Sequence, residues 1–420
     1  MTGINRRSVL KAGAGAAAAA TLPGSLAAQR PGAGGWDVIV IGAGVFGSWT
    51  ARKLQDAGKR VLLVDAWGPA HARASSGGES RMTRGAYGGD AVYTRMALDS
   101  LADWRTLSDQ SARSGLPIFH QTGVLFFFPQ VEPFLEQTMA AHRQLRLPTE
   151  LLDTAAMRRR FPQFDFTGIA AGLFEPGFGA LMARRGVLTL TDQFVRAGGE
   201  YLQARIATPE ETGRPLSHVI TKSGEQLHAE QFVFACGPWL GHVFPRLLGP
   251  RIFPTRQEIF FFAPPPGDPR FGEHRLPGWA DFNGGDMYYG FPDLEARGFK
   301  IAHDAHGPPI DPDTGDRTPS PQALAEVRAY MARRFPLMAD RPLNEARVCQ
   351  YENSSNGDFL IDRHPALANV VLVGGGSGHG FKHGPAVGRY AADLVMGTLP
   401  APEPRFSLAT KAEVQHRTVH

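Results

Sequence analysis

The stretch from residue 37 to residue 65 restricts the possible folds of this chain more than any other part of its sequence. Residues 37–41 (DVIVI) form an apolar, β-branched run that ends at the glycine turn 42–47 (GAGVFG). Residues 45–57 have the apolar spacing of a helix that stops at Gly58, and residues 60–64 (RVLLV) predict a second buried strand that ends in Asp65. A strand, a glycine turn, a helix and a second strand make up the first unit of a Rossmann-like α/β domain.

The glycines of this turn predict a dinucleotide site. Gly42 permits the tight turn, Gly44 lets the backbone approach a pyrophosphate at the helix N-terminus, and Gly47 lets the helix pack closely on the strand. Asp65 follows Gly47 by 18 residues and would accept a hydrogen bond from a ribose hydroxyl. An acid at this position favours FAD or NAD over NADP.

A second glycine-rich turn lies near the C-terminus. Residues 369–373 (NVVLV) predict another buried strand, which is followed by the turn 374–382 (GGGSGHGFK) and by helix-like spacing over residues 385–396. The return of a glycine turn so late in the chain indicates a nucleotide domain that is discontinuous in sequence. The amides of this turn and the following helix N-terminus could stabilise negative charge on a flavin ring.

The first 28 residues are typical of an export leader. Arg6 and Arg7 precede Leu10 and Lys11, an alanine-rich stretch reaches Thr21, and small residues end the segment near Ala28. This pattern resembles a twin-arginine signal peptide, which exports proteins already folded. A membrane anchor is the alternative, but the apolar stretch is short compared with the roughly 20 residues that a span needs. We therefore expect cleavage near Ala28, a soluble mature protein, and a periplasmic or secreted location.

Charge and cysteine content exclude two classes of protein. The formal net charge is +4, yet the leader holds three bases and no acid, so the rest of the chain has 41 bases (44 − 3) and 40 acids. This balance argues against an electrostatic nucleic-acid binder. The two cysteines, Cys236 and Cys349, allow at most one disulfide and do not supply the four ligands of a structural zinc site.

Several motifs together resemble the D-amino-acid-oxidase-like flavoenzymes, in the branch of monomeric sarcosine oxidase, N-methyltryptophan oxidase and pipecolate oxidase. The similar segments are the first glycine turn with Asp65-Ala66, and residues 79–87 (ESRMTRGAY), 288–292 (YYGFP) with Lys300, 349–351 (CQY), 359–365 (FLIDRHP) and 377–382 (SGHGFK). The resemblance implies an α/β plus α+β fold, in which a discontinuous, Rossmann-like FAD-binding domain is interleaved with a sheet-rich substrate domain. The FAD-binding domain would comprise residues 36–120, 187–250 and 356–405, and the substrate (catalytic) domain residues 121–186 and 251–355, after a leader of residues 1–28.

The resemblance also implies which residues hold FAD. Cys349 matches the position that attaches the flavin covalently through a thioether to its 8α-methyl group, whereas Cys236 fits a buried residue at the end of a strand. The other residues expected at the cofactor are Gly42, Gly44, Val45, Phe46, Gly47, Asp65, Ala66, His71, Ser75, Ser76, Arg81, Met82, Ile206, Gly376, Gly378, His379, Gly380 and Lys382.

By the same resemblance, a second set of residues acts on the substrate. Arg84 and Lys382 match a pair that binds the substrate carboxylate, and Lys300 matches a lysine whose positive charge activates oxygen. Arg81 matches a second active-site arginine close to the flavin ring. Tyr289 and Tyr351 match tyrosines of the substrate pocket, although a tyrosine in a sheet often only packs.

Three positions depart from the pattern of sarcosine oxidase. Gly77 and Asp304 stand where that enzyme has histidines, although His303 and His306 flank Asp304 and a shift of the loop register would restore an imidazole. Gly376 replaces a bulky aromatic residue. We expect these changes to enlarge the pocket and to place an acid opposite a substrate cation, which favours an amine larger than sarcosine.

The leading hypothesis is an FAD-dependent oxidase of a secondary amine or an (N-methyl) amino acid, which passes hydride to flavin and electrons to O2 and yields an imine and H2O2. The alternatives are a periplasmic dehydrogenase that uses a quinone or another acceptor, a flavin-binding protein without turnover, and an NAD-linked enzyme. The expected partners are the small amine or amino acid, the electron acceptor and the twin-arginine export machinery. We expect a monomer with no metal, no nucleic acid and no stable membrane anchor. Residues 308–321 predict an exposed loop.

Overall fold

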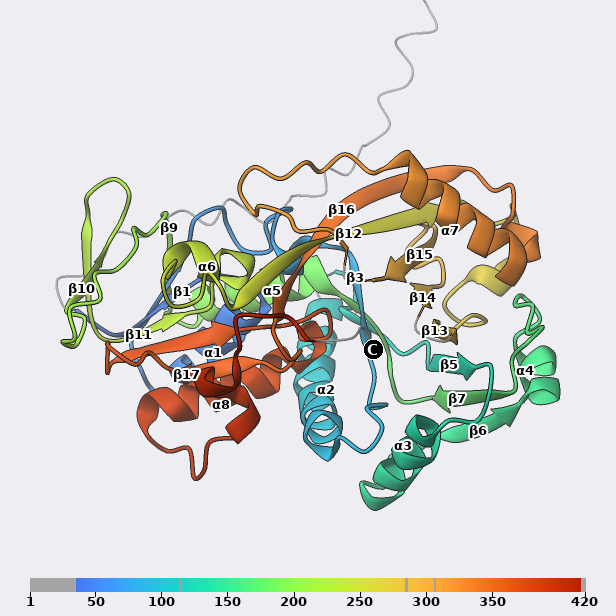
Figure 1. Cartoon of the computed structure of the whole chain (residues 1–420), viewed down its shortest axis with the longest axis horizontal. Coiled ribbons are helices and arrows are strands. Elements are labelled where there is room, and N and C mark those ends of the chain that lie inside the picture. The colour runs from blue at the N-terminus through green and yellow to red at the C-terminus, as the bar shows by residue number, and fades with distance from the viewer. Residues whose placement is uncertain (1–34, 114, 284–285, 306, 417–420) are drawn as a thin grey trace, which may run out of the picture.

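The computed structural model describes residues 35–113, 115–283, 286–305 and 307–416. The predicted leader and His306 lie outside these described residues. Figure 1 shows two lobes side by side, each built around one large β-sheet. The long paired strands β12 (Ile252–Phe262) and β16 (Leu343–Ser354) run from one lobe into the other.

The first lobe contains a seven-stranded sheet whose main path has the order β17-β18-β11-β1-β2-β9. Its central strands are parallel, β17 pairs antiparallel at one edge, and β10 pairs antiparallel with β11. The strands are β1 (Trp36–Ile41), β2 (Val61–Asp65), β9 (Glu200–Gln203), β10 (His218–Ile220), β11 (Gln226–Phe234), β17 (Leu360–Arg363) and β18 (Val370–Gly374). The apolar run 38–41 is buried throughout, as expected of a parallel strand covered on both faces.

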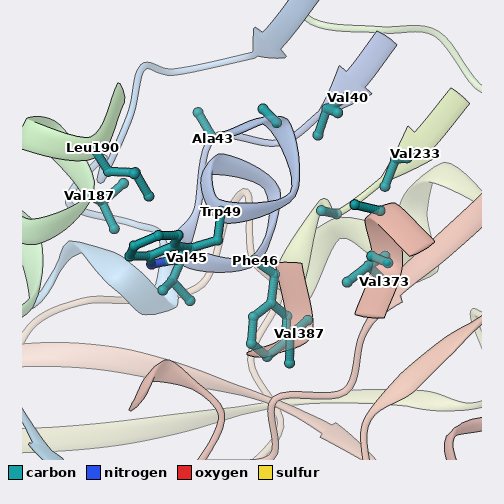
Figure 2. Packing of buried hydrophobic residues seen from close by; sticks show 14 of the residues in the cluster. Val40, Ala43, Val45, Phe46, Trp49, Val187, Leu190, Val233, Val373 and Val387 are labelled. Carbon is teal, nitrogen blue, oxygen red and sulfur yellow. The ribbon is translucent and has the colours of Figure 1, made fainter. Parts of the chain in front are cut away.

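Helices cover this sheet, and their apolar side chains form a buried core with those of the strands. Helix α1 (Val45–Asp56) packs between α8 (Gly384–Met396) and α5 (Ala183–Arg196), and α2 (Ala91–Ala112) contacts both of these helices. Figure 2 shows Trp49 of α1 near Val187 and Leu190 of α5, with Val387 of α8 close to Phe46. The short helix α6 (Leu240–Val243) adds Leu240 to a second cluster of buried apolar residues.

The second lobe contains an eight-stranded sheet in the order β16-β12-β15-β14-β13-β5-β7-β6. Neighbouring strands are antiparallel except for the parallel pair β13 and β5. The remaining strands are β5 (Val124–Phe128), β6 (Glu150–Asp153), β7 (Ala171–Glu175), β13 (Gly278–Asn283), β14 (Asp286–Phe291) and β15 (Phe299–Asp304). Helices α3 (Pro133–Gln144), α4 (Thr154–Arg160) and α7 (Pro321–Arg334) complete this lobe.

A small antiparallel sheet joins the lobes. It consists of β3 (Ser80–Thr83), β8 (Gly179–Met182) and β4 (Phe119–His120), in the order β3-β8-β4. Short 3-10 turns occur at Ser75–Gly77, Gly237–Trp239, Pro269–Phe271, Pro336–Met338, Phe381–His383, Pro404–Phe406 and Leu408–Thr410. Strand β3 therefore carries the 79–87 motif directly between the two large sheets.

The predicted α/β plus α+β fold is confirmed. The strand, turn, helix and strand over residues 37–65 occur as β1, α1 and β2, and the late strand and helix occur as β18 and α8. The seven-stranded sheet draws its strands from three separate segments, and all of these fall within the ranges predicted for the FAD-binding domain. None of the helices in the described part of the chain combines the length and the apolar character that crossing a bilayer requires.

Candidate active site

A large cavity opens where the parallel strands of the first lobe end. Its empty volume, including the open mouth, is about 1510 Å³, and residues 41–46 form part of its wall. The carboxyl ends of parallel strands are the usual place for a ligand in such a sheet. We call this space the cofactor cavity.

The glycine turn shapes one wall of the cofactor cavity. Gly42 has a φ of 106°, and a Cβ atom added to it would lie 2.3 Å from the carbonyl oxygen of Ala235. A Cβ atom on Gly47 would lie 1.8 Å from the carbonyl oxygen of Gly42. Gly44 caps helix α1, and the Ser76 hydroxyl accepts a hydrogen bond from the amide of Val45 at 3.0 Å. The backbone thus lies open to a ligand at the N-terminus of the helix.

Asp65 marks another part of the same cavity. Its Oδ2 accepts from the amide of Ala43 at 2.7 Å, and its Oδ1 accepts from the amides of Trp67 and Gly68 at 2.8 and 2.9 Å. Burial raises the pKa of Asp65, although these three amides act in the opposite direction. The ring of His71 stacks on Trp67 at 5.6 Å, and both residues line the cavity.

A second, smaller cavity lies between the lobes, with an empty volume of about 790 Å³. Four residues line both cavities: Arg81, Tyr351, Gly378 and Phe381. The smaller cavity also has an apolar wall, made by Met82, Phe126, Ile259, Ala280, Phe282 and Met287. We call it the substrate cavity because a group bound in it would reach the cofactor cavity through the shared residues.

Two cations from distant segments meet in the substrate cavity. Lys382 is buried, and its Nζ donates to the carbonyl oxygen of His379 at 2.8 Å. Arg84 donates to the carbonyl oxygen of Ala86. The Arg84 Cζ lies 4.1 Å and the Lys382 Nζ 5.0 Å from the centre of the Tyr87 ring, so one aromatic ring contacts both cations.

A buried carboxyl supports the backbone beside Arg84. Glu175 lies at the end of β7, and its Oε1 accepts from the amide of Gly85 at 2.9 Å. His142 Nε2 lies 3.6 Å from the same oxygen. Burial raises the pKa of Glu175 to about 8, although Arg84 and Lys382 act in the opposite direction.

Cys349 lies on β16 beside the junction of the two cavities. Its sulfur is buried, lines the substrate cavity and accepts a hydrogen bond from Arg81 at 3.4 Å. The same guanidinium donates to the carbonyl oxygens of Ser75 and Ser80 at 2.6 and 2.9 Å. These backbone contacts fix Arg81 where it faces both cavities.

Tyrosines and one acid complete the substrate cavity. Tyr351 donates to Asp304 Oδ1 at 3.0 Å. Burial and, after it, the charge of Asp304 raise the pKa of Tyr289 to about 12, so the phenol stays protonated. Among the described residues that line this cavity, Asp304 is the only carboxylate, and three cationic side chains, Arg81, Arg84 and Lys382, line the same cavity.

Lys300 occupies a different place from the other predicted residues. Its Nζ donates to the carbonyl and hydroxyl oxygens of Ser80 at 2.9 and 3.2 Å, and it lines a third, small cavity that also includes Glu79 and Arg297. It lines neither the cofactor cavity nor the substrate cavity. Burial lowers the pKa of Lys300 well below its usual range, and the charge of Arg81 lowers it further. Its charge therefore depends on its surroundings, and its role in oxygen activation stays a prediction.

The structure brings most of the predicted cofactor residues together. Those that line the cofactor cavity are Gly42, Gly44, Val45, Phe46, Asp65, Ala66, His71, Ser75, Ser76, Arg81, Ile206, Gly376, Gly378 and Gly380. Met82, Cys349, His379 and Lys382 line the substrate cavity instead, and Gly47 lines neither because it packs against Gly42.

The departures from sarcosine oxidase have different consequences. Gly376 lines the cofactor cavity near Phe46, and a Cβ atom on Gly77 would lie 2.0 Å from the carbonyl oxygen of His71, so neither glycine enlarges the substrate cavity. The ring of His303 stacks on Tyr288 at 4.6 Å, outside the substrate cavity, and Asp304 faces the cavity. His306 lies outside the described residues.

Sequence reasoning missed several residues of the two cavities. Glu352, Cys236, Arg205, Trp239 and His242 line the cofactor cavity, and Gln257 lines the substrate cavity. Residues 349–353 (CQYEN) carried one signal, because so many polar side chains are unusual in a buried strand. Burial raises the pKa of the Cys236 thiol, and the charge of Asp65 raises it further, so this cysteine stays protonated and unreactive.

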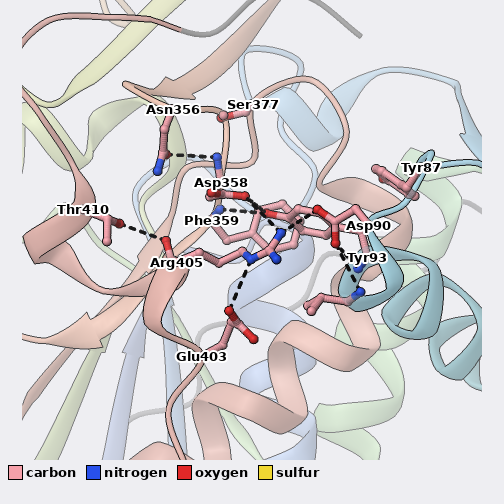
Figure 3. A network of polar contacts seen from close by, with 12 residues as sticks. Tyr87, Asp90, Tyr93, Asn356, Asp358, Phe359, Ser377, Glu403, Arg405 and Thr410 are labelled. Atoms are coloured by element: carbon pink, nitrogen blue, oxygen red, sulfur yellow. Dashed lines mark hydrogen bonds and ion pairs between the residues drawn. The ribbon is translucent and has the colours of Figure 1, made fainter. Parts of the chain in front are cut away.

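A network of hydrogen bonds and ion pairs connects helix α2, the loop after β16 and the C-terminal segment (Figure 3). Tyr93 donates to Asp358 at 2.9 Å, and Arg405 from the C-terminal segment binds Asp90 and Glu403. Asp90 caps the start of helix α2. The C-terminal segment thus ties α2 to the loop after β16, close to the His379 turn.

Comparison with known proteins shows which family this chain belongs to. A family model described as FAD dependent oxidoreductase (DAO) matches residues 37–394, which is most of the chain. The chain belongs to the family of FAD dependent oxidoreductases. Monomeric sarcosine oxidase from Bacillus sp. (strain B-0618) is 30% identical over 371 residues, covering 86% of this chain and 92% of that protein. N-methyl-L-tryptophan oxidase from Salmonella newport (strain SL254) is 30% identical over 381 residues, covering 87% and 96%.

A solved structure of another enzyme shares the fold. The L-proline dehydrogenase from P. horikoshii superposes with a TM-score of 0.77 at 20% identity and covers 89% of this chain and 97% of its own. A further sequence model, TAT (twin-arginine translocation) pathway signal sequence, matches residues 3–23. The predictions of an FAD-dependent enzyme of this family and of a twin-arginine signal are therefore confirmed.

The cofactor cavity fits FAD. The glycine turn forms a cradle that side chains would fill, the amides at the start of α1 suit a pyrophosphate, and Asp65 suits a ribose hydroxyl. Arg81 and Tyr351 lie where the cavity meets the substrate cavity, which suits the reactive ring. The described residues include no group of three or more His, Cys, Asp or Glu side chains placed to hold a metal ion.

Proposed function

We propose that this chain is an FAD-dependent oxidase of a secondary amine or an N-methyl amino acid. One observation carries the proposal: the substrate cavity meets the cofactor cavity at four shared residues and is lined by two cations, Arg84 and Lys382, that both contact the Tyr87 ring. The names of the similar proteins, monomeric sarcosine oxidase and N-methyl-L-tryptophan oxidase, support an N-methyl amino acid.

In this proposal the residues of the substrate cavity bind and orient the substrate. Arg84 offers parallel N–H donors to the substrate carboxylate, and Lys382 adds a point charge. The apolar wall around Phe126 and Phe282 excludes water and turns the reacting C–H bond toward the shared residues Arg81 and Tyr351. FAD, when bound, would take a hydride from the carbon beside the amine nitrogen.

With O2 as the acceptor the reaction balances. The amine loses two electrons and two protons and becomes an imine, and O2 gains both and becomes H2O2. Water then hydrolyses the imine to a carbonyl compound and an amine. A substrate larger than sarcosine is favoured by Asp304, which lines the substrate cavity and can receive a cationic group of the substrate.

A dehydrogenase that passes electrons to a quinone or another acceptor is the second candidate. The observation in its favour is the position of Lys300, which lines neither main cavity and has a lowered pKa. A permanent charge beside the ring would favour the oxidase.

The decisive experiment is an anaerobic screen of amino acids and their N-methyl forms, with loss of the visible flavin absorbance as the readout. We expect bleaching by an N-methyl amino acid and much slower bleaching by the same amine without its carboxylate. Arg84→Ala and Lys382→Ala should each raise the half-saturating concentration about 10- to 100-fold, because each removes a charge-assisted contact. Equal rates for the carboxylate-free amine would contradict the proposed anchor.

We further propose that Cys349 attaches the flavin covalently. The sulfur lies at the junction of the cavities and accepts a hydrogen bond from Arg81. FAD should stay on the polypeptide after acid denaturation of the natural chain and should be released from Cys349→Ser. Cys236→Ser is the matched control, since Cys236 lines the cofactor cavity and its thiol stays protonated. Free FAD from the denatured natural chain would disprove the attachment.

Export to the periplasm or beyond, as a folded and FAD-loaded monomer, is the last part of the proposal. The twin-arginine match at residues 3–23 supports the route, and the name of monomeric sarcosine oxidase supports the monomer.

A further inference from the structure

Glu352 is a buried carboxyl in the wall of the cofactor cavity. It follows Tyr351 on β16, and its side chain is 6% exposed. No cofactor role for this residue was expected from the sequence. A carboxyl at this depth needs polar partners, because an unpaired charged or polar group is costly to bury.

One oxygen of this carboxyl lacks such a partner. The backbone amides of Gly375 and Gly376 face the group and stabilise its charge. Oε1, in contrast, has no hydrogen-bond partner among the described residues. A Cβ atom on Gly374 would lie 2.3 Å from Oε1, so the first glycine of the late turn is what makes room for this side chain. A buried and unpartnered oxygen on a side chain that lines a ligand cavity calls for a ligand.

The position of Glu352 indicates which part of FAD it meets. The start of helix α1 suits the pyrophosphate, and Asp65 suits the ribose of the adenosine end. Tyr351 and Arg81 lie at the other end, where the two cavities meet. Glu352 also lines the cofactor cavity and faces Gly375 and Gly376, and Gly376 lies near Phe46 in the first turn of α1. We therefore infer that Glu352 lies between the pyrophosphate and the ring. The ribityl chain, with its hydroxyl groups, occupies that part of FAD.

We propose that Glu352 binds FAD through a hydrogen bond between its Oε1 and a hydroxyl group of the ribityl chain. The inference rests on the FAD site and not on the proposed oxidation of an amine. Burial raises the pKa of Glu352 to about 8, so the carboxyl is mostly protonated at neutral pH and can donate as well as accept.

The test measures FAD release from the full-length holoprotein. Glu352→Leu and Glu352→Gln are made in a Cys349→Ser background, in which FAD can leave, and release after dilution is followed by flavin fluorescence. Glu352→Leu should speed release about 10- to 100-fold, because it removes one hydrogen bond to a buried polar group. Glu352→Gln should stay within about threefold of the background, because an amide can still bond a hydroxyl.

Glu175→Gln is the matched control. Glu175 is also a buried carboxyl with an unpartnered oxygen and a pKa raised to about 8, but it lines neither main cavity. Its substitution should leave FAD release unchanged. Unchanged release from Glu352→Leu, or equal acceleration by Glu352→Leu and Glu175→Gln, would overturn the proposal.

FAD analogues that lack single ribityl hydroxyls locate the contact. For one analogue, Glu352→Leu should no longer speed release, since the partner of the carboxyl is already missing. If Glu352→Leu accelerates the release of FAD and of every analogue equally, the contact is not with the ribityl chain and the proposal fails. None of these measurements depends on turnover, so failure of the proposed oxidase activity would not affect them.

Discussion

Lys300 and Lys382 are both buried lysines, 1% and 4% exposed, but they face different spaces. Lys382 lines the substrate cavity. Lys300 lines the third, small cavity instead and donates to the carbonyl oxygen of Ser80, to which Arg81 also donates. Burial lowers the pKa of Lys300, the charge of Arg81 lowers it further, and Glu79 acts in the opposite direction.

This difference predicts separate kinetic effects for the two lysines. If Lys300 stabilises the charge that develops on oxygen, Lys300→Met should slow reoxidation of the reduced flavin about 100- to 1000-fold and change its reduction by substrate much less. Lys382→Met, the matched control, should slow reduction and spare reoxidation. Stopped-flow absorbance separates the two half-reactions. Equal reoxidation rates in Lys300→Met and the natural chain would favour the dehydrogenase over the oxidase.

At the scale of elements, the loop predicted over residues 308–321 is largely exposed up to the start of α7, as its composition predicts, but its residues 307–320 are also tied to the first lobe. The segment forms a strap over the rim of the cofactor cavity, and Asp313 fastens it. Asp313 accepts from Trp239 Nε1 at 3.0 Å and from Arg205 Nη2 at 2.8 Å, and its carbonyl oxygen accepts from Arg73 at 2.6 Å. Trp239 and Arg205 line the cofactor cavity, so the strap from one lobe is bound to the cofactor wall of the other.

Removal of this fastening should loosen the strap. Asp313→Ala should speed limited proteolysis within residues 307–320 about tenfold, because the lost hydrogen bonds contribute about 1–2 kcal/mol to the closed strap. Asp316→Ala is the control, since its carboxylate accepts from Thr318 within the same segment. The cleavage sites are read by mass spectrometry. Identical cleavage rates for both variants would show that Asp313 does not hold the strap.

At the scale of the whole molecule, the twin-arginine match couples folding to export. A chain that must bind FAD before it crosses a membrane benefits from a route that accepts folded cargo. Replacing Arg6 and Arg7 by Lys should therefore leave the precursor in the cytoplasm. Arg30→Lys, beyond the matched residues 3–23, is the control and should not change export. Fractionation and immunoblotting report both outcomes, and normal processing of the double variant would refute the assigned route.

The sequence alone determined the parts of this molecule that are encoded locally. The apolar run 37–41, the glycine turn and Asp65 predicted β1, α1 and β2 because continuous apolar runs, helical spacing and the conformational freedom of Gly42 act over a few residues. The family and the twin-arginine leader followed from motifs of the same short range. The domain boundaries and the roles of single site residues stay predictions.

Only the tertiary structure decided which residues from distant parts of the sequence lie side by side. Arg84 and Lys382 are about 300 residues apart, yet they share the Tyr87 ring because β3 and the turn before α8 meet between the two sheets. The same packing places Lys300 against Ser80, outside the two main cavities, and Glu352 against Gly374. It also brings Asp313 of the strap to Arg205 in the wall of the cofactor cavity. Local patterns carry no information about such pairings, since they depend on how sheets and helices fill space together.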